Sequence, residues 1–371
     1  MVAIKKRVVS LDTFRGLTIA GMILVNILSF YPDTPEMLGH SSWVGLTLAD
    51  LVFPFFLFIV GVSMTYSFAS RSKMSSKKMW RHFIFRVLAL YLIGVALGFG
   101  IFVNGIPDFY TIRIPGVLQL IALSSLFAAP FARLESRWIL LTAGILMLFQ
   151  TFILLGVSAP GVPAGSLDMN NNIAGYVDSR VFGPAHLLDD GFDPEGIIAT
   201  INGTAMVLLG LVFGRSLRLS EDKWKTVQLL LGSGILAIII GLLISPVLPL
   251  IKQLWTASFI LVNAGLATII LALLYAYMDI LGKGKILKLA VPFGRNALII
   301  YILSLLLGVL IFLPRYYLPG GGYIDIDDTT IPFLSQFLGP AGGTVAFGII
   351  VIAFWWLVAY IMDKKKVYIK L

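Results

Sequence analysis

Residues 38–64 read LGHSSWVGLTLADLVFPFFLFIVGVSM, and this stretch decides both the fold class and the position of the polar groups. From Leu51 onward it is almost entirely apolar, and crossing a bilayer takes roughly 20 such residues in an α-helix. His40 precedes the apolar run, and Asp50 lies near its beginning. A carboxylate inside a span costs about 2.5 to 3.5 kcal/mol, so it must be paired, protonated or facing water. We therefore expect a membrane helix with a polar site near the membrane surface.

The composition of the whole chain predicts an all-α polytopic membrane protein. The 371 residues are 58% apolar and only 13% charged, and the mean hydropathy is +0.94. Soluble domains contain roughly 25% charged residues. We expect a single transmembrane domain over residues 1–371 with about ten spans. Their approximate ranges are 10–30, 46–68, 82–103, 114–131, 138–157, 197–214, 226–245, 254–278, 289–313 and 342–362.

The basic residues predict the orientation of these spans. If the N-terminus is cytoplasmic, the cytoplasmic segments hold 22 of the 28 Lys and Arg residues, and the opposite side holds four. Cytoplasmic loops carry this excess in membrane proteins. We therefore expect both termini in the cytoplasm and two long extracytoplasmic loops, at about 158–196 and 314–341. The net charge of +9 then reflects topology, and the lipid bilayer, not nucleic acid, is the expected partner.

The cysteine and histidine content of the chain excludes several kinds of catalytic and metal site. The chain has no cysteine, which excludes thiolate catalysis, disulfides and cysteine-bound metal clusters. Its three histidines stand in three different sequence environments, so we expect no metal site. His82 lies among basic residues and His186 in a long loop, and a surface role is favoured for both.

Three polar residues converge on one end of the first two spans. Asn26 follows an apolar stretch near the end of the first span, where an amide either joins two helices or points into a cavity. His40 lies in the short loop between Asn26 and Asp50, and an imidazole can accept a proton at physiological pH. Asp50 either supports this histidine or forms a structural ion pair between helices, and the sequence leaves both interpretations open.

Seven short motifs occur in order from about residue 7 to the C-terminus. The motifs are SLDTFRG…MILVN, HSSWVGLTLADLVFPFFLFIVG, RIPGVLQLIAL, AGYVD, FDPEGIIATINGTAMVLLGLVFG, LWTASF and FGRNALIIY. Together they resemble the heparan-alpha-glucosaminide N-acetyltransferase family, a family of polytopic transmembrane acyltransferases.

This resemblance implies transfer of acetyl from cytosolic acetyl-CoA to the amino group of a glucosamine-type sugar on the extracytoplasmic side. It also implies that His40 and Asn26 are the active-site histidine and asparagine. The animal enzymes have an additional N-terminal luminal domain and span, so we expect a bacterial, core-only member in the inner (plasma) membrane. YPDTPEMLG, between the two site residues, departs from the animal pattern and leaves the acceptor open.

The implied reaction suggests a role for each catalytic candidate. His40 would remove the amine proton as a general base. Asn26 would donate a hydrogen bond to the oxyanion or orient the acceptor, which typically contributes about 10²- to 10³-fold. Asp50 would fix the imidazole tautomer. An acetyl-imidazole on His40 is the alternative to direct transfer, because the chain has no other evident nucleophile.

Charged and aromatic residues supply the candidate binding groups. Arg15, Arg86 and Arg295 are candidates for the phosphates of acetyl-CoA, with positive-inside topology as the competing explanation. We predict that the acceptor is contacted by Trp43, Arg113, Asp193 and Glu195. Arg113 would alternatively pair with an acid, and the two carboxylates would alternatively cap the following helix.

Two other functions stay open at this point. O-acetylation of a cell-envelope glycan is the nearest alternative within the enzyme class. A secondary transporter would fit the span count equally well, although the sequence shows no second copy of the polar constellation. The sequence also leaves open whether the chain forms a homodimer.

Overall fold

A computed structural model of the chain describes residues 8–71, 75–98, 110–189, 191–312, 315–317 and 323–369. Within these ranges the regular secondary structure is helical except for two short hairpins, which confirms the all-α prediction. Eight described helices are long and apolar enough to cross a membrane, or nine if one bent pair counts as a single span. A shorter apolar helix, Val117–Arg133, occupies the fourth predicted span. Each of the ten predicted segments therefore contains apolar helix.

The described residues form two compact units, and the boundary between them falls within two helices, α2 (Ala49–Ser70) and α10 (Ala257–Leu274). Unit 1 comprises residues 1–41, 47–53 and 273–371, and unit 2 comprises residues 42–46 and 54–272. The prediction that the whole chain acts as one transmembrane domain stays a prediction.

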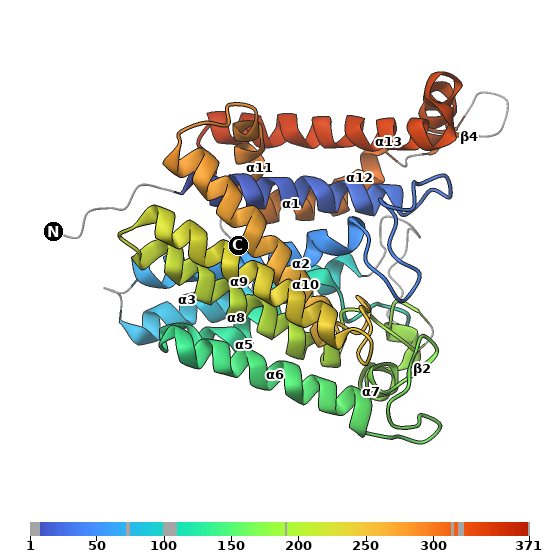
Figure 1. The fold of residues 1–371 in the computed structure, drawn as a ribbon. Helices are drawn as coiled ribbons and strands as arrows, with labels where there is room; N and C mark the ends of the chain where they lie inside the picture. Colours follow the sequence, from blue (N-terminus) through green and yellow to red (C-terminus); the bar gives the residue numbers. More distant parts are fainter. Residues whose placement is uncertain are drawn as a thin grey trace. The chain divides into compact units, whose positions relative to one another are not determined.

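Unit 1 is built around α1 (Val9–Leu28), which packs against α11, α12 and α13 (Figure 1). The carboxylate of Asp279 caps α1 by accepting hydrogen bonds from the backbone N–H groups of Val9 and Ser10, at 2.9 Å each. The remaining elements of this unit are η3 (Tyr275–Ile280), η4 (Leu287–Ala290), α11 (Val291–Arg295), α12 (Ala297–Phe312), β3 (Arg315–Tyr317), β4 (Tyr323–Asp325) and α13 (Ile326–Lys364).

Glycines allow α1 to approach α11 and η4 closely. A Cβ atom on Gly16 would lie 1.9 Å from the Ala290 carbonyl oxygen, and one on Gly294 would lie 1.7 Å from that of Asp12. Small residues permit such backbone contacts between membrane helices. The SLDTFRG and FGRNA motifs therefore meet in unit 1.

Unit 2 is a helical bundle in which α8 (Ile197–Leu219) packs against α5, α6 and α9 (Figure 1). Most of α8 is buried, because it is apolar around most of its circumference. The other elements of this unit are α3 (Ser76–Leu97), α5 (Val117–Ala128), η1 (Ala129–Arg133), α6 (Ser136–Gly156), β1 (Leu167–Asp168), β2 (Asn171–Asn172), α7 (Ile173–Phe182), η2 (Pro184–His186) and α9 (Lys223–Ile244).

A buried polar network fixes the LWTASF segment against α6 and α8. Asn202 donates hydrogen bonds to the Gln150 side-chain oxygen and to the Trp255 carbonyl oxygen, at 2.9 and 2.7 Å. Gln150 in turn donates to the Leu254 carbonyl oxygen at 2.7 Å. The Trp255 indole then donates to the carbonyl oxygen of Pro194 at 2.9 Å, so the network holds the FDPEG loop in place.

Several predicted boundaries differ from the structure. α3 begins at Ser76 and not near residue 82, because the Ser75 side chain caps a polar first turn. The ninth predicted span bends by 79° between Leu287–Arg295 and the helix that starts at Ala297. By contrast, α13 (Ile326–Lys364) consists of two helices that meet at Gly339, which has a φ of 72° and precedes Pro340, so the helix after this break begins close to the predicted residue 342.

The two predicted outer loops also contain regular structure. Residues 158–196 hold the β1–β2 hairpin, α7 and η2. Part of the loop predicted at 314–341 is helical, because α13 starts with the acidic first turn that favours a helix N-terminus.

The close contact between α2 and α8 within unit 2 yields a stability prediction. A Cβ atom on Gly210 would lie 2.1 Å from the Phe58 carbonyl oxygen. We expect Gly210→Ala to destabilise the protein by about 1 to 3 kcal/mol through overpacking. Gly232 on α9 has nothing within 4 Å of the same position, so Gly232→Ala is the matched control. Melting temperatures in detergent check this, and equal values for the two variants would contradict the packing described.

Candidate active site

The structure brings His40 and Asp50 together in unit 1. Nδ1 of His40 lies 2.8 Å from Oδ1 of Asp50. The Asp50 side chain is fully buried in the first turn of α2, and the His40 side chain is 37% exposed. An ionised carboxylate only accepts hydrogen bonds, so this contact places the hydrogen of a neutral imidazole on Nδ1. The lone pair of Nε2 is then the one that can take a proton.

Asp50 also organises the loop that carries His40. Oδ2 accepts hydrogen bonds from the backbone N–H groups of Ser41 and Thr47, at 3.2 and 3.1 Å, and from the Thr47 hydroxyl at 3.0 Å. The same hydroxyl lies 2.8 Å from the Gly39 carbonyl oxygen, so its one hydrogen is shared between the two acceptors. Burial of the carboxylate is thus offset by several hydrogen bonds. Sequence reasoning missed Thr47, although the spacing T-x-x-D before an apolar run resembles a capping box.

Asn26 makes a different contact. Its side-chain amide lies on α1 and donates to the Tyr301 hydroxyl at 3.3 Å. Tyr301, at the end of the FGRNALIIY motif, is 2% exposed. Of the three predicted catalytic residues, the structure therefore pairs His40 with Asp50, and it pairs Asn26 with a residue that sequence reasoning did not single out.

Arg15 and Arg295 lie near the contact between α1 and α11. Arg15 donates to the Gly294 carbonyl oxygen at 3.0 Å, and its Nη1 is 3.6 Å from Asp12 Oδ1. Nη1 of Arg295 donates to both carboxylate oxygens of Asp363, at 2.9 and 3.0 Å. Each cation therefore has a protein partner already.

Buried polar atoms near these two arginines lack partners among the described residues. They are the hydroxyls of Ser10 and Thr13, which flank Asp12 on α1, and both amide atoms of Asn296, which follows Arg295. Buried polar groups without a hydrogen bond are costly, and each one calls for an explanation such as a bound polar molecule.

Arg86, the third candidate for the donor phosphates, belongs to unit 2. It lies on α3 and lines a small cavity together with Arg71 and His82. The structure therefore groups Arg15 with Arg295 and leaves Arg86 in the other unit.

Arg113 is the centre of an ion cluster in unit 2. Its guanidinium donates to both oxygens of Asp193 at 2.8 Å, and it also donates to Glu195. The side chains of Asp193 and Glu195 are 0% and 8% exposed. Burial raises the pKa of Glu195 even though Arg113 opposes the shift. The sequence left open whether Arg113 contacts the acceptor or pairs with an acid. In the structure it pairs with two acids, Asp193 and Glu195.

Asp178 on α7 supports the start of α8, and sequence reasoning did not identify it. Its Oδ1 accepts the backbone N–H of Ile197 at 2.9 Å, and the carboxylate lies against Gly196. Burial, with a smaller contribution from the charge of Asp193, raises the pKa of Asp178 to about 7. Asp178 therefore has a structural role, because it accepts a hydrogen bond at the start of α8.

Trp43, the other predicted acceptor residue, also lies in unit 2. Its indole nitrogen donates to the Leu167 carbonyl oxygen at 2.8 Å. Its ring meets that of Phe192 edge to face, with centroids 5.6 Å apart. Trp43 is thus anchored to the long loop between α6 and α8.

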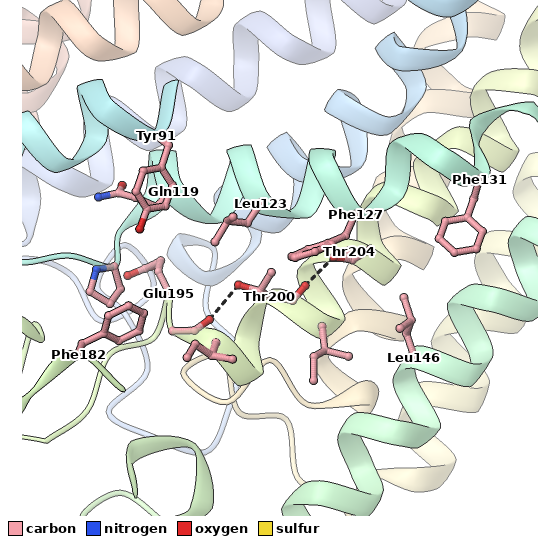
Figure 2. Close-up of a pocket in the computed structure, with 14 residues that line it drawn as sticks. Tyr91, Gln119, Leu123, Phe127, Phe131, Leu146, Phe182, Glu195, Thr200 and Thr204 are labelled. Carbon is pink, nitrogen blue, oxygen red and sulfur yellow. Dashed lines mark hydrogen bonds between the residues drawn. The ribbon is translucent and has the colours of Figure 1, made fainter. Parts of the chain in front are cut away.

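A mostly apolar cavity of about 520 Å³ lies between α3, α5, α6 and α8. Figure 2 shows Glu195 and Gln119 toward one end and Phe131 and Leu146 toward the other. The hydroxyl of Thr200 also faces the cavity but is already bonded to the Gly196 carbonyl oxygen. Glu195 is therefore shared between the ion cluster and this cavity.

Comparison with known proteins then identifies the family. A family model described as "Heparan-alpha-glucosaminide N-acetyltransferase, catalytic" matches residues 7–241, which is more than half of the chain. The chain belongs to this family. The match confirms the family resemblance inferred from the sequence motifs.

Two curated proteins named heparan-alpha-glucosaminide N-acetyltransferase are similar to the chain. The human protein (Homo sapiens) is 28% identical over 434 aligned residues, which cover 100% of this chain and 60% of the human protein. The mouse protein (Mus musculus) is 31% identical over 271 residues, which cover 58% of this chain and 40% of the mouse protein. The chain thus spans about 60% of the length of its human relative.

The Arg113 cluster yields a second stability prediction. Arg113→Ala leaves Asp193 and Glu195 buried without their cation, so we expect a loss of about 3 to 5 kcal/mol. Arg137→Ala is the matched control, because the Arg137–Glu135 pair is 71% and 68% exposed. Exposed pairs contribute about 0 to 1 kcal/mol. Melting in detergent separates the two, and a wild-type melting temperature for Arg113→Ala would contradict the structural role of this cluster.

Proposed function

We propose that the protein is a membrane acetyltransferase that moves acetyl from acetyl-CoA to the amino group of a glucosamine-type sugar. The single observation that carries this proposal is the His40–Asp50 pair within the HSSWVGLT motif of a chain that belongs to this family. A buried carboxylate bonded to a half-exposed imidazole is the arrangement that a general base needs.

His40 acts as the general base through Nε2. Asp50 receives the hydrogen on Nδ1 and stabilises the imidazolium that forms when Nε2 takes a proton. Carboxylates play this orienting role beside catalytic histidines in other enzymes, where the wrong tautomer costs about 10⁴ in kcat. Asp50 is thus a positioning residue for His40.

Asn26 contributes a hydrogen-bond donor. Its amide is held by the buried Tyr301 hydroxyl, which restricts the directions in which it can point. Because this contact already orients the amide, little conformational entropy is lost when the amide donates a hydrogen bond to the oxyanion that forms in the reaction. Asn26 therefore either stabilises the tetrahedral intermediate or orients the acceptor amine.

The reaction balances without another reactant. The neutral amine attacks the thioester carbon and forms the C–N bond, and Nε2 of His40 accepts the proton that the nitrogen releases. Collapse of the tetrahedral intermediate breaks the C–S bond, and the thiolate recovers the proton from the imidazolium. We propose this direct transfer in a ternary complex, with an acetyl-imidazole on His40 as the alternative.

The arginines of unit 1 are proposed to bind the phosphates of acetyl-CoA, the acetyl donor. Arg15 shares α1 with Ser10 and Thr13, and Arg295 precedes Asn296. The buried polar side-chain atoms of these three residues have no hydrogen-bond partner within the described part of the chain. Guanidinium groups bind phosphate oxygens well, and uncommitted hydroxyl and amide groups suit the polar arm of acetyl-CoA. We also include Arg86, whose position in a basic segment of α3 suits a phosphate.

Trp43, Arg113, Asp193 and Glu195 are proposed to serve the acceptor. Asp193 acts through Arg113 and Glu195, because both of its oxygens also accept backbone N–H groups, from Leu188 and Glu195. Glu195 lines the cavity, and its carboxylate oxygens keep lone pairs that can accept hydrogen bonds from sugar hydroxyl or ammonium groups. Trp43 follows His40 by three residues in the sequence, and its aromatic ring is proposed to contact the acceptor.

We further propose a bacterial inner-membrane location, with acetyl-CoA entering from the cytoplasm and the acceptor on the other side. The distribution of Lys and Arg among the loops supports this orientation. Two other functions remain testable, O-acetylation of an envelope glycan and secondary transport.

Acetyl transfer by purified protein in detergent tests the proposal. With labelled acetyl-CoA and glucosamine, we expect an amide product that survives mild alkali, which an O-acetyl ester would not. His40→Ala should lower kcat by about 10²- to 10⁴-fold and Asn26→Ala by about 10²- to 10³-fold. Arg137→Ala, a change in the exposed Arg137–Glu135 pair, is the control and should keep wild-type activity.

Three results would contradict the proposed site, the direct transfer or the enzyme class, respectively. Wild-type activity in His40→Ala would exclude this site. A labelled acetyl group retained by wild-type protein without acceptor, and lost in His40→Ala, would replace direct transfer by the acetyl-imidazole. Absence of transfer in detergent, together with substrate flux in proteoliposomes, would favour the transporter.

A further inference from the structure

The N-terminal end of α3 carries a surface cavity in unit 2, and the proposed reaction does not use it. The volume of this α3 cavity is about 490 Å³, and its lining residues are Lys78, Arg81, His82 and Phe85. Two of these side chains are cations, the third is an imidazole, and no described residue that lines the cavity is acidic. The charge of the α3 cavity therefore favours an anionic ligand.

The basic groups of the α3 cavity are available to such a ligand. Among the described residues, the side chains of Lys78, Arg81 and His82 form no hydrogen bond and no ion pair, and all three are exposed. His82 also lines the small neighbouring cavity that contains Arg71 and Arg86. Several cations therefore gather at this end of unit 2 without a carboxylate among the described residues that line the two cavities.

Aromatic rings hold this end of α3 against the end of α2. The centroid of the Phe68 ring lies 6.4 Å from that of Trp80 and 5.7 Å from that of Phe83. The Ser75 hydroxyl caps the first turn of α3 by accepting the backbone N–H of Lys78 at 3.4 Å. Tryptophan is enriched where membrane helices cross the headgroup region. Trp80 therefore indicates that the α3 cavity lies at the depth of the lipid headgroups.

An exposed apolar track continues from the cavity along α3. The track consists of Phe85, Leu88 and Leu92, whose exposed fractions are 69%, 55% and 64%. These residues follow Arg81 at intervals of three or four positions, so all four share one face of the helix. From Arg81 to Leu92 an α-helix rises about 16 Å, which matches one leaflet of a hydrocarbon core about 30 Å thick.

The cavity and the apolar track together identify the class of ligand. A soluble phosphate compound would use only the basic end, whereas a phospholipid would use the basic end and the track. A zwitterionic lipid also carries an ammonium group, for which the described lining of the cavity provides no carboxylate. Basic pockets at the ends of membrane helices suit anionic headgroups.

We propose that the N-terminal end of α3 is a binding site for an anionic phospholipid. Lys78 and Arg81 bind the phosphate, and His82 adds a hydrogen bond to the headgroup. One acyl chain lies along the apolar track. This inference goes beyond the proposed function, because no step of the acetyl transfer involves these residues. It places the lipid at the membrane surface that the basic residues predict to be cytoplasmic.

Lipid titration of the full chain in detergent tests the site. Native mass spectrometry measures the apparent affinity for dioleoylphosphatidylglycerol, which is anionic, and for dioleoylphosphatidylcholine, which is zwitterionic. Wild type should bind the anionic lipid at least about tenfold more tightly than the zwitterionic one. Lys78→Gln with Arg81→Gln should weaken binding of the anionic lipid by about 30-fold, because each basic residue near a membrane surface contributes about fivefold.

Lys223→Gln with Lys225→Gln is the matched control. Both lysines are exposed in the first turn of α9, another helix of unit 2 that is long and apolar enough to cross a membrane, and the change removes the same charge. Unlike the basic residues of α3, they directly follow two acids, Glu221 and Asp222. This variant should keep the wild-type affinity for the anionic lipid within about twofold.

A charge-conserving variant separates loss of binding from loss of folding. Lys78→Arg with Arg81→Lys keeps both cations, so it should retain the preference for the anionic lipid. Equal affinity of wild type for the two lipids would overturn the proposal. Equal affinity of the two glutamine double variants for the anionic lipid would overturn it as well.

Competition distinguishes a lipid from a soluble phosphate compound. Glycerol 3-phosphate and acetyl-CoA lack the two acyl chains, so a tenfold molar excess of either over dioleoylphosphatidylglycerol should leave the bound lipid in place. Displacement by either compound would assign the α3 cavity to a soluble phosphate ligand and overturn the lipid site. Because the assay measures no acetyl transfer, its result is independent of whether the proposed reaction occurs.

Discussion

The buried carboxylate of Asp50 is the constraint on which the candidate active site depends. It lies in the first turn of α2 and accepts hydrogen bonds from the His40 ring, from two backbone N–H groups and from the Thr47 hydroxyl. A carboxylate without these partners would be costly to bury beside a membrane helix. The same bonds that satisfy the charge therefore also hold the loop and orient the ring of His40, so one set of contacts serves the stability of the loop and the role proposed for His40.

Unit 2 also contains buried carboxylates, but a cation and not a set of neutral donors stabilises them. There Arg113 neutralises Asp193 and Glu195, and the Gln150–Asn202 network holds the adjoining segment through Trp255. Three predicted acceptor residues are thereby committed to one another before any substrate arrives. The earlier part of the same loop, residues 162–192, differs, because several of its polar side chains have no hydrogen-bond partner among the described residues. Uncommitted groups in a fixed frame are better suited to ligand recognition than committed ones.

Much of the helical architecture could be predicted from the sequence, because membrane spans are determined by long apolar runs and the charges between them. The family and the proximity of His40 to Asp50 were also accessible, since both residues lie within one short motif. The Asn26–Tyr301 contact was not, because it joins residues 275 positions apart. Likewise, no local signal shows that Gly294 faces Asp12, or that helix α13 would extend through the predicted loop to Gly339.

The central claim is that Asp50 makes His40 a base, and the kcat of Asp50→Asn tests it most directly. Thr47→Val is the control, because it removes the hydroxyl that contacts Gly39 and Asp50 but keeps the His40–Asp50 pair. We predict that kcat falls by about 10²-fold or more in Asp50→Asn, as for other histidines that lose their orienting carboxylate, whereas Thr47→Val loses less than about tenfold at similar melting temperature. A wild-type kcat in folded Asp50→Asn would contradict it.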